Sequence, residues 1–270
     1  MLEVIDSSSI ETKIKKVHDI ARGKKVLVAF SGGVDSSILA SLVSDVAEQT
    51  ILVMQRGDSV GIGEDDFAKK EAEQLGLEIR FIEYDEYEES EEYRLNPQNR
   101  CYFCKSLLHS KLEVIRQELD FDIVVNGTNK SDLGGHRPGY QAVMEQGAIS
   151  PLVEAELIKP EIRRIAKLRG LYSSDKPATP CIASRIKTGV AIDGELLREI
   201  RVSEDLLKRK YNFSIIRLRY NGTTFELELG DRESIPQLEE LHKYLQENGV
   251  SRQISEIRRY KPYVPPNHEN

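Results

Sequence analysis

The sequence predicts an α/β protein: a doubly wound parallel sheet with a smaller C-terminal α+β domain. Short apolar runs rich in β-branched residues alternate with segments whose apolar residues recur at helical spacing, and a Gly- and Ser-rich loop follows the first run. From about Lys187 the pattern changes to two alternating segments around Asn221-Gly222, a strong hairpin signal. We therefore expect a first domain over residues 1–186 and a second over residues 187–270.

The first domain is expected to begin with an amphipathic helix over residues 10–21. The alternating elements that follow are a strand over 24–30, a helix over 35–48, a strand over 50–55, a helix over 64–76 and a strand over 77–84. The acidic segment 84–99 has no clear period and is expected to be a solvated loop or a mobile lid. A helix over 103–119, a strand starting near 121 and a shorter strand near 148–154 complete the domain.

The second domain is expected to contain two helices and three strands. They are a helix over 193–210, strands over 213–220 and 223–230, a helix over 234–247 and a strand over 253–260. The proline-rich end, residues 261–270, is expected to be a loose tail.

Composition narrows the class of protein. The chain has 270 residues, and no apolar run approaches the roughly 20 residues that a membrane helix needs. Its first residues lack the basic-then-apolar order of a secretory signal, so we expect a cytoplasmic protein without membrane contacts. The net charge of −7 argues against a stable nucleic-acid partner and favours a small-molecule substrate.

The loop with the sequence AFSGGVDSS spans residues 29–37, between the first strand and its helix. The N–H groups and the dipole of a helix start attract an anion, glycines admit a phosphate to the backbone, and serines can donate hydroxyls. A Walker loop is not present, because its lysine is missing. The expected phosphate contacts come from Ser31, Gly32, Gly33, Ser36 and Ser37. A plain strand-to-helix turn capped by Asp35 or Ser36 is the alternative.

Residues 31–36 match the whole SGGxDS signature, and here the sequence resembles the PP-loop, or N-type ATP pyrophosphatase, superfamily. The resemblance implies ATP and Mg²⁺, transfer of AMP to a carboxyl or carbonyl oxygen, and release of pyrophosphate. It also implies adenine near Met54 to Arg56 and a role for Asp35 at the phosphates or magnesium. Asp35 as a simple N-cap is the alternative.

A second loop, residues 126–140, follows the fourth expected strand on the edge of the sheet where doubly wound folds bind ligands. Gly127 and Thr128 are expected to border the nucleotide. Asp132 and Arg137 are candidates for substrate contacts, whereas His136 is interpreted as an ordinary loop residue.

The chain has three cysteines, two of them spaced as CxxC at the start of a helix. Cys101, Cys104 and the distant Cys181 are one ligand short of an all-cysteine zinc site. Three thiolates suit a four-iron, four-sulfur cluster with one iron left open, and an open iron can hold an exogenous sulfide. In the alternative, the CxxC pair packs as small helix residues and Cys181 alone is reactive.

With these residues added, the sequence resembles the LarE family, ATP-dependent sulfur-insertion enzymes that make the nickel-pincer nucleotide cofactor of lactate racemase. The stretches that carry the resemblance are SGGVDSS, CYFCKSLLHSKL, NGTNKSD, PCIASRI and IIRLRY. It implies a pyridinium dicarboxylate mononucleotide as substrate, each carboxylate of which is adenylated and converted to a thiocarboxylate. It also implies a homo-oligomer, and a sulfide source or cysteine desulfurase as partner.

The resemblance assigns further residues. Ser184, Arg185, Arg217 and Arg219 are expected to hold phosphate and carboxylate oxygens. Glu204 is interpreted as part of a solvated helix face, and a metal- or substrate-side carboxylate of the family is the alternative that the resemblance offers. Family members that have only the cysteine matching Cys181 give up its own sulfur. The additional CxxC pair places this sequence with the cluster-containing branch, in which Cys101, Cys104 and Cys181 are catalytic and bind the cluster.

Other functions stay open at this level. A tRNA-thiolating PP-loop enzyme also combines this loop with three cysteines, although the acidic charge argues against it. An amidotransferase-type synthetase would leave the cysteines unexplained. A non-catalytic nucleotide-binding redox sensor would release no pyrophosphate.

Overall fold

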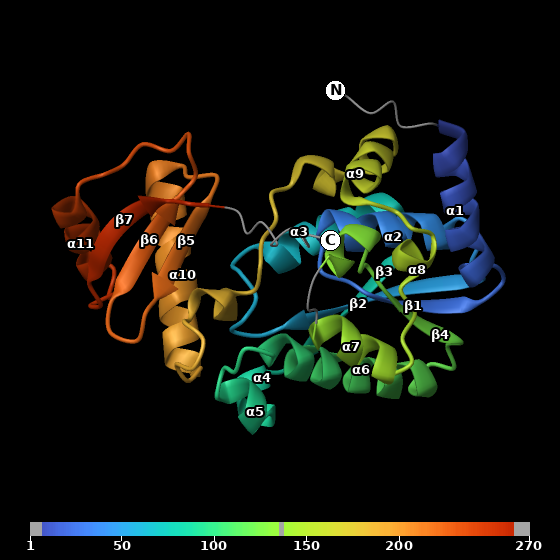
Figure 1. Ribbon diagram of the computed structural model, residues 1–270, viewed down its shortest axis with the longest axis horizontal. Coiled ribbons are helices and arrows are strands. Elements are labelled where there is room, and N and C mark those ends of the chain that lie inside the picture. The colour runs from blue at the N-terminus through green and yellow to red at the C-terminus, as the bar shows by residue number, and fades with distance from the viewer. Residues whose placement is uncertain (1–6, 135–137, 262–270) are drawn as a thin grey trace, which may run out of the picture. The chain divides into compact units, whose positions relative to one another are not determined.

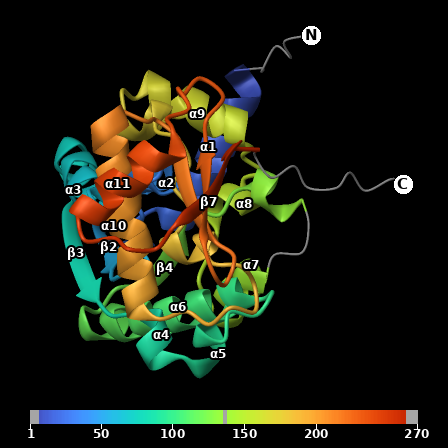
Figure 2. The same cartoon turned by 90° about the vertical axis from the view of Figure 1, so that its left-hand side faces the viewer.

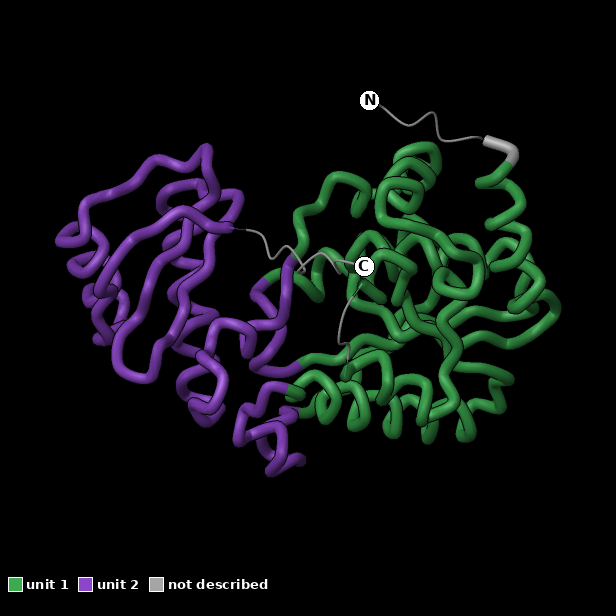
Figure 3. Tube along the Cα trace, in the orientation of Figure 1, with its two compact units in different colours: residues 1–56, 63–84, 99–178 green, residues 57–62, 85–98, 179–270 purple. Residues whose placement is uncertain are grey.

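The computed structural model describes residues 7–134 and 138–261. The chain divides into two compact units, coloured separately in Figure 3. Unit 1 contains residues up to 56, then 63–84 and 99–178. Unit 2 contains residues 57–62 and 85–98 together with the chain from 179 onward. Two short segments that directly follow strands of the first sheet therefore belong to the second unit.

Unit 1 is built on a parallel sheet with the strand order β3-β2-β1-β4. Its strands are β1 (Lys25–Ala29), β2 (Gln49–Arg56), β3 (Glu78–Glu83) and β4 (Ile123–Asn126). Val28 on the central strand pairs with Leu52 on one side and Val125 on the other. The expected parallel α/β sheet is confirmed.

Helices cover both faces of this sheet (Figure 1). One face carries α1 (Ser7–Ala21), α2 (Val34–Ser44), α3 (Glu64–Leu75) and α9 (Lys159–Leu168); the other carries α6 (Arg100–Glu118) and α7 (Pro138–Glu145). On the second face, Leu27 and Ile51 of the sheet pack with Leu112 and Val143 of the helices. Burial on both faces explains why the central strands are continuously apolar.

The acidic segment 84–99 differs from the expected solvated loop. It forms two short helices, α4 (Glu86–Glu89) and α5 (Glu91–Arg94), and Ser90 caps the second by accepting a hydrogen bond from the Tyr93 N–H. Tyr93 and Asn96 are almost fully buried, and Asn96 donates to the carbonyls of Lys187 and Val190, both at 2.9 Å. The acidic composition of the segment gave no indication that these two side chains would be buried and anchor it.

The prediction of a strand near residues 148–154 is largely wrong. Only Ile149 bridges to Val125, and the chain then turns into α8 (Pro151–Glu154). Pro151 has no N–H to give to a sheet, but it fits the first turn of a helix. Three single-turn helices also connect the elements: η1 (Lys130–Leu133), η2 (Tyr172–Asp175) and η3 (Ile182–Arg185).

Unit 2 contains a small mixed sheet of β5 (Ile216–Tyr220), β6 (Phe225–Leu229) and β7 (Ile254–Arg259). β5 and β6 form the antiparallel hairpin predicted at Asn221-Gly222, and β6 connects to the parallel β7 through α11 (Leu238–Glu247). α10 (Gly194–Tyr211) and α11 contact the sheet and each other (Figure 2). None of the helices in the described ranges is both long enough and apolar enough to span a bilayer.

Candidate functional site

The loop after β1 enters α2 through two glycines with different roles. Gly32 has a φ of +65°, and a Cβ added there would lie 3.2 Å from the Cβ of Ala68 on α3, so this position favours glycine on both counts. Gly33 is the N-cap of α2 in an extended conformation and makes no side-chain cap. The first N–H groups of α2 are therefore available to an anion at the carboxyl end of the sheet.

The serines of this loop divide into two groups. The Ser36 hydroxyl stabilises the turn, because it donates to the Gly33 carbonyl at 3.0 Å and accepts from the Ser31 N–H at 3.3 Å. Ser31 itself is exposed. Ser37 is fully buried, and its hydroxyl has no hydrogen-bond partner among the described residues. The Ser37 side chain thus lies in the protein interior, and its expected phosphate contact stays a prediction.

Asp35 lies two residues inside α2 and is not its N-cap, so the capping alternative is wrong. Its carboxylate forms an ion pair with Lys159 of α9 and accepts a hydrogen bond from Asn129 Nδ2 at 3.3 Å. Burial raises the pKa of the Asp35 carboxyl, while Lys159 acts in the opposite direction. A carboxylate oxygen beside a phosphate loop is the kind of ligand that Mg²⁺ prefers, so this donor fits the implied ion.

The loop after β4 presses against the start of α2. A Cβ added at Gly127 would lie 2.8 Å from the backbone nitrogen of Ser36, so only glycine fits there. Asn129 is buried and links this loop to α2, because its Nδ2 donates to Asp35 at 3.3 Å as well as to Asp132 of its own loop at 2.7 Å. Asp132 is thus used in a capping box of its own turn. The predicted residues Arg137 and His136 lie outside the described residues.

Met54 lies near the end of β2 and is 4% exposed. Two residues on, the Arg56 guanidinium stacks 3.7 Å from the centre of the Phe81 ring and pairs with Asp65 at 3.1 Å. Adenine binding at this edge stays a prediction.

The cysteines are all free thiols. Cys101 and Cys104 lie in the first turns of α6 in unit 1, where their three-residue spacing puts them on one face of the helix. Cys101 is exposed, and Gly139 of α7 packs against it: an added Cβ would be 3.5 Å from the Cys101 Cβ. Cys181 is exposed in unit 2, immediately before η3. Thiolates are suitable ligands for iron, but no group of three His, Cys, Asp or Glu side chains within 7–134 and 138–261 is placed to hold a metal ion.

Arg185 forms a closed ion pair with Glu204 of α10. The Arg185 side chain is 1% exposed, and its guanidinium donates to both Glu204 oxygens, at 2.8 and 3.0 Å. Its remaining donors reach the Pro180 carbonyl at 2.9 Å and the Ser184 hydroxyl at 3.0 Å. Glu204 also accepts from the Leu218 N–H at 2.7 Å, so the expectation that it lies on a solvated helix face is wrong. The pair therefore attaches the turn after Cys181 to α10 within unit 2.

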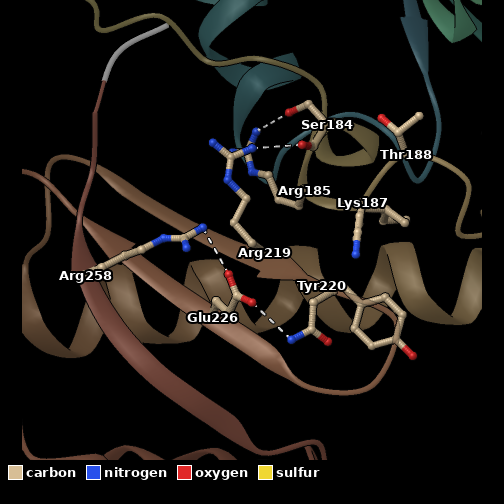
Figure 4. Close-up of a pocket in the computed structure, with 10 residues that line it drawn as sticks. Ser184, Arg185, Lys187, Thr188, Arg219, Tyr220, Glu226 and Arg258 are labelled. Atoms are coloured by element: carbon tan, nitrogen blue, oxygen red, sulfur yellow. Dashed lines mark hydrogen bonds and ion pairs between the residues drawn. The ribbon is translucent and has the colours of Figure 1, made fainter. Parts of the chain in front are cut away.

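A cavity of about 410 Å³ opens beside this turn (Figure 4). Its lining residues are Ser184, Arg185, Ile186, Lys187, Thr188, Arg219, Tyr220, Asn221, Glu226 and Arg258. Arg219 is held by Glu228 at 2.9 Å and by the Ser184 carbonyl at 2.9 Å. The Lys187 amino group points into the cavity and has no side-chain partner within the described part of the chain.

Arg217, predicted to act with Arg219, does not line this cavity. It is 8% exposed, its guanidinium donates to the Ile216 carbonyl at 2.7 Å, and it lies 5.6 Å from the centre of the Tyr260 ring. Burial lowers the pKa of the Arg217 guanidinium. The structure therefore brings Ser184, Arg185 and Arg219 together and places Arg217 apart from the cavity lining.

Comparison with known proteins gives three informative relatives, whereas no family model matches the chain. The protein slr1717 of Synechocystis sp., described as uncharacterized, is 35% identical over 81% of this chain and 82% of its own length. The protein MJ0830 of Methanocaldococcus jannaschii, also described as uncharacterized, is 29% identical over 90% of this chain and 93% of its own length. The pyridinium-3,5-bisthiocarboxylic acid mononucleotide synthase of Lactiplantibacillus plantarum, which is LarE, is 29% identical over 81% of this chain and 78% of its own length.

The chain belongs to the same family as slr1717, and it is similar to LarE over most of its length. The matches cover most of both chains, so the likeness is not limited to one motif.

Sequence reasoning missed three residues of this LarE-like chain. Lys187 and Arg258 line the cavity in unit 2, and Lys159 pairs with Asp35 in unit 1. A helix start at Lys159 is signalled by Pro160 and by the apolar spacing that follows. Nothing local signals the pairing of Lys159 with Asp35, because 124 residues separate them.

Proposed function

We propose that the chain is an ATP-dependent sulfurtransferase of nickel-pincer nucleotide biosynthesis. It adenylates the carboxylates of pyridinium-3,5-biscarboxylic acid mononucleotide and converts them to thiocarboxylates. The observation that carries the proposal is the 29% identity, over 81% of the chain, to a synthase named for its bisthiocarboxylic acid product. The anion-receiving loop between β1 and α2 supports it independently.

In this proposal unit 1 is a PP-loop nucleotide site. The N–H groups of the loop and the Ser31 hydroxyl would receive the β- and γ-phosphates of ATP, and Asp35 would hold Mg²⁺. Gly127 and Met54 would border the nucleotide. A substrate carboxylate oxygen attacks the α-phosphorus, and the bond from that phosphorus to the bridging oxygen breaks, which releases pyrophosphate. Sulfide then attacks the acyl carbon and expels AMP, which leaves a thiocarboxylate.

The cavity in unit 2 is proposed as the site for the anionic groups of the mononucleotide. Arg219 is already oriented by Glu228 and the Ser184 carbonyl, and Lys187, which pairs with no carboxylate of the described residues, contributes a cation that points into the space. Arginine matches carboxylate and phosphate oxygens in pairs, while lysine acts as a point charge. Arg185, by contrast, supports this site by holding the turn that contains Ser184.

The cysteines are proposed to supply the sulfur. Cys101, Cys104 and Cys181 would hold a four-iron, four-sulfur cluster, which when bound would provide sulfide at an open iron. A sulfide source or a cysteine desulfurase would restore it. This part of the proposal rests on the donor chemistry and on the number of cysteines.

The reaction is tested by incubating the protein with ATP, Mg²⁺, sulfide and the biscarboxylic mononucleotide. We expect pyrophosphate release that depends on the mononucleotide, and a product in which mass spectrometry finds oxygen replaced by sulfur. An Arg219→Gln variant should raise the KM for the mononucleotide and leave the KM for ATP unchanged. Pyrophosphate release that ignores the mononucleotide would contradict the proposal.

The cluster is tested separately by anaerobic reconstitution, followed by iron and acid-labile sulfide analysis. We expect about four irons per chain, lost in each of Cys101→Ala, Cys104→Ala and Cys181→Ala. If no iron binds and only Cys181→Ala abolishes sulfur transfer, the cluster is wrong and the Cys181 thiol is itself the sulfur donor.

A further inference from the structure

The peptide unit that follows Cys181 is held at both its carbonyl and its N–H. The Cys181 carbonyl accepts from the Ser184 N–H at 3.0 Å and from the Arg185 guanidinium at 3.3 Å. The N–H of the same peptide unit, which belongs to Ile182, donates to the Ser59 carbonyl at 2.8 Å. Because this peptide unit is attached directly to the Cys181 Cα, its orientation limits the directions that the thiol can take.

Ser59 is itself fixed in the interior of unit 2. It is 2% exposed, and its hydroxyl donates to the Glu86 carboxylate at 3.0 Å. Glu86 lies on α4 and is also 2% exposed. A carboxylate buried this deeply depends on its hydrogen-bond donors. The hydroxyl therefore ties the backbone of Ser59 to α4, and with it the carbonyl to which Ile182 is bonded.

The residue before Ser59 strengthens the same attachment. The Asp58 N–H donates to the Asp85 carboxylate at 2.6 Å. The Asp58 carboxylate accepts from the Tyr87 hydroxyl at 3.2 Å and pairs with Arg201 of α10 at 3.4 Å. The segment that contains Ser59 is thus attached to both α4 and α10, so its carbonyl is a fixed acceptor and not part of a freely moving loop.

This segment continues directly from a strand of the first sheet. β2 ends at Arg56, and the next residues, Gly57–Ile62, belong to unit 2. In the proposed function, Met54 borders the nucleotide near this end of β2. One short run of chain therefore connects the strand proposed to border the nucleotide with the backbone that holds Cys181.

We propose that Ser59 is a positioning residue for the Cys181 thiol, which it orients through its bonds to Glu86 and Ile182. This inference rests on the proposed function, in which adenylation and sulfur transfer are successive steps. Sulfur transfer requires the sulfur source to meet the activated acyl carbon, and a misplacement of about 1 Å can cost about 100-fold in rate. Adenylation does not use Cys181. Loss of the Ser59 hydroxyl should therefore slow the second step and spare the first.

The test measures the thiocarboxylate formed per pyrophosphate released. The anaerobically reconstituted protein is given ATP, Mg²⁺, sulfide and the biscarboxylic mononucleotide. In Ser59→Ala this ratio should fall about 10-fold, while the initial rate of pyrophosphate release stays within about twofold. An acyl adenylate that receives no sulfur is returned by water to the carboxylate and AMP. Ser59→Thr keeps the hydroxyl and should recover most of the ratio. A general loss of folded protein would lower both products together and leave the ratio unchanged.

Amide hydrogen exchange tests the link itself without any measurement of activity. The Ile182 N–H should exchange about 10-fold faster in Ser59→Ala than in the unaltered protein, because its acceptor is held less firmly. The amides of β1, in the other unit, should keep their protection.

The chain offers a matched control in Ser173. Its hydroxyl donates to the Glu71 carboxylate at 2.7 Å, and both residues are fully buried. This pair lies in unit 1, on α3 and η2, and makes no bond to the peptide unit after Cys181. Ser173→Ala therefore removes the same kind of hydrogen bond, and it should leave the ratio of thiocarboxylate to pyrophosphate as in the unaltered protein.

Four results would overturn the inference. An unchanged ratio in Ser59→Ala would do so and leave the proposed function intact. An equal fall in Ser59→Ala and Ser173→Ala would mean that any buried serine has this effect. A lower ratio with unchanged exchange at Ile182 would exclude the route through that N–H. An unaltered protein that forms no thiocarboxylate would overturn both this inference and the proposed function.

Discussion

The two units of the molecule each place an ion pair beside a candidate site, and the two pairs differ in kind. In unit 2, Arg185 and Glu204 have side chains that are 1% and 11% exposed and are joined by two hydrogen bonds, and Arg185 also donates to the Pro180 carbonyl and the Ser184 hydroxyl. In unit 1, the side chains of Lys159 and Asp35 are 35% and 27% exposed. A buried pair with further hydrogen bonds around it fixes a turn, whereas an accessible pair leaves its charges available to a ligand. Charge alone therefore does not identify a binding residue.

The largest expected effect comes from breaking the buried pair. Glu204→Gln leaves the Arg185 guanidinium buried beside a neutral partner, which should lower the free energy of unfolding by about 3–5 kcal/mol. Urea denaturation measures the loss. The neighbouring residue Asp205 gives a control, because its pair with Arg209 is on the surface of the same helix, and Arg209→Gln should cost no more than about 0.5 kcal/mol. Similar losses in the two variants would mean that the Arg185 pair is hydrated.

An intermediate effect is expected where two loops of unit 1 touch. In Gly127→Ala the new Cβ would meet the backbone of Asp35 and Ser36 at 2.8–3.0 Å, and backbone atoms cannot move aside as a side chain can. We expect a loss of about 1–3 kcal/mol in unfolding free energy, together with weaker pyrophosphate binding. Gly134→Ala is the control, since its Cβ would be 3.9 Å from its nearest neighbour. Unchanged pyrophosphate affinity in Gly127→Ala would separate this contact from the nucleotide site.

The smallest effect concerns a buried group that has no counter-ion. His109 of α6 is 2% exposed, and its Nδ1 has no partner among the described residues. Burial, helped by Lys105, lowers the pKa of His109 from 6.5 to about 4. The unfolded chain therefore binds a proton between these values that the folded chain does not, so stability falls as the pH drops through this range.

Substitution of His109 removes that dependence. From pH 7 to pH 5, the unaltered protein should lose about 2 kcal/mol more unfolding free energy than His109→Leu. Chemical denaturation at the two pH values measures the difference. Parallel losses in the two proteins would show that His109 is protonated in the folded state.

Local patterns in the sequence accounted for most of the architecture. The strand cores of the first sheet, the hairpin at Asn221-Gly222 and the end of α3 at Gly76, which adopts φ +66°, all follow from residues that are neighbours in the chain. The same holds for the loop between β1 and α2, because glycine, serine and a preceding buried strand specify it locally. In one missed segment composition was misleading: the acidic stretch 84–99 is anchored by Tyr93 and Asn96, which are almost fully buried. In the other, near 148–154, Pro151 starts a helix where a strand was expected.

The sequence by itself determined which chemical groups are present and which local structure carries them: the loop, the three cysteines and the arginines of β5. Only the tertiary structure decided how those groups are used. It buried Ser37, closed Arg185 onto Glu204 and brought Lys159 across 124 residues to Asp35. The physical reason is that backbone conformation responds mainly to neighbouring residues, whereas burial and charge pairing depend on groups that meet only after the chain has folded.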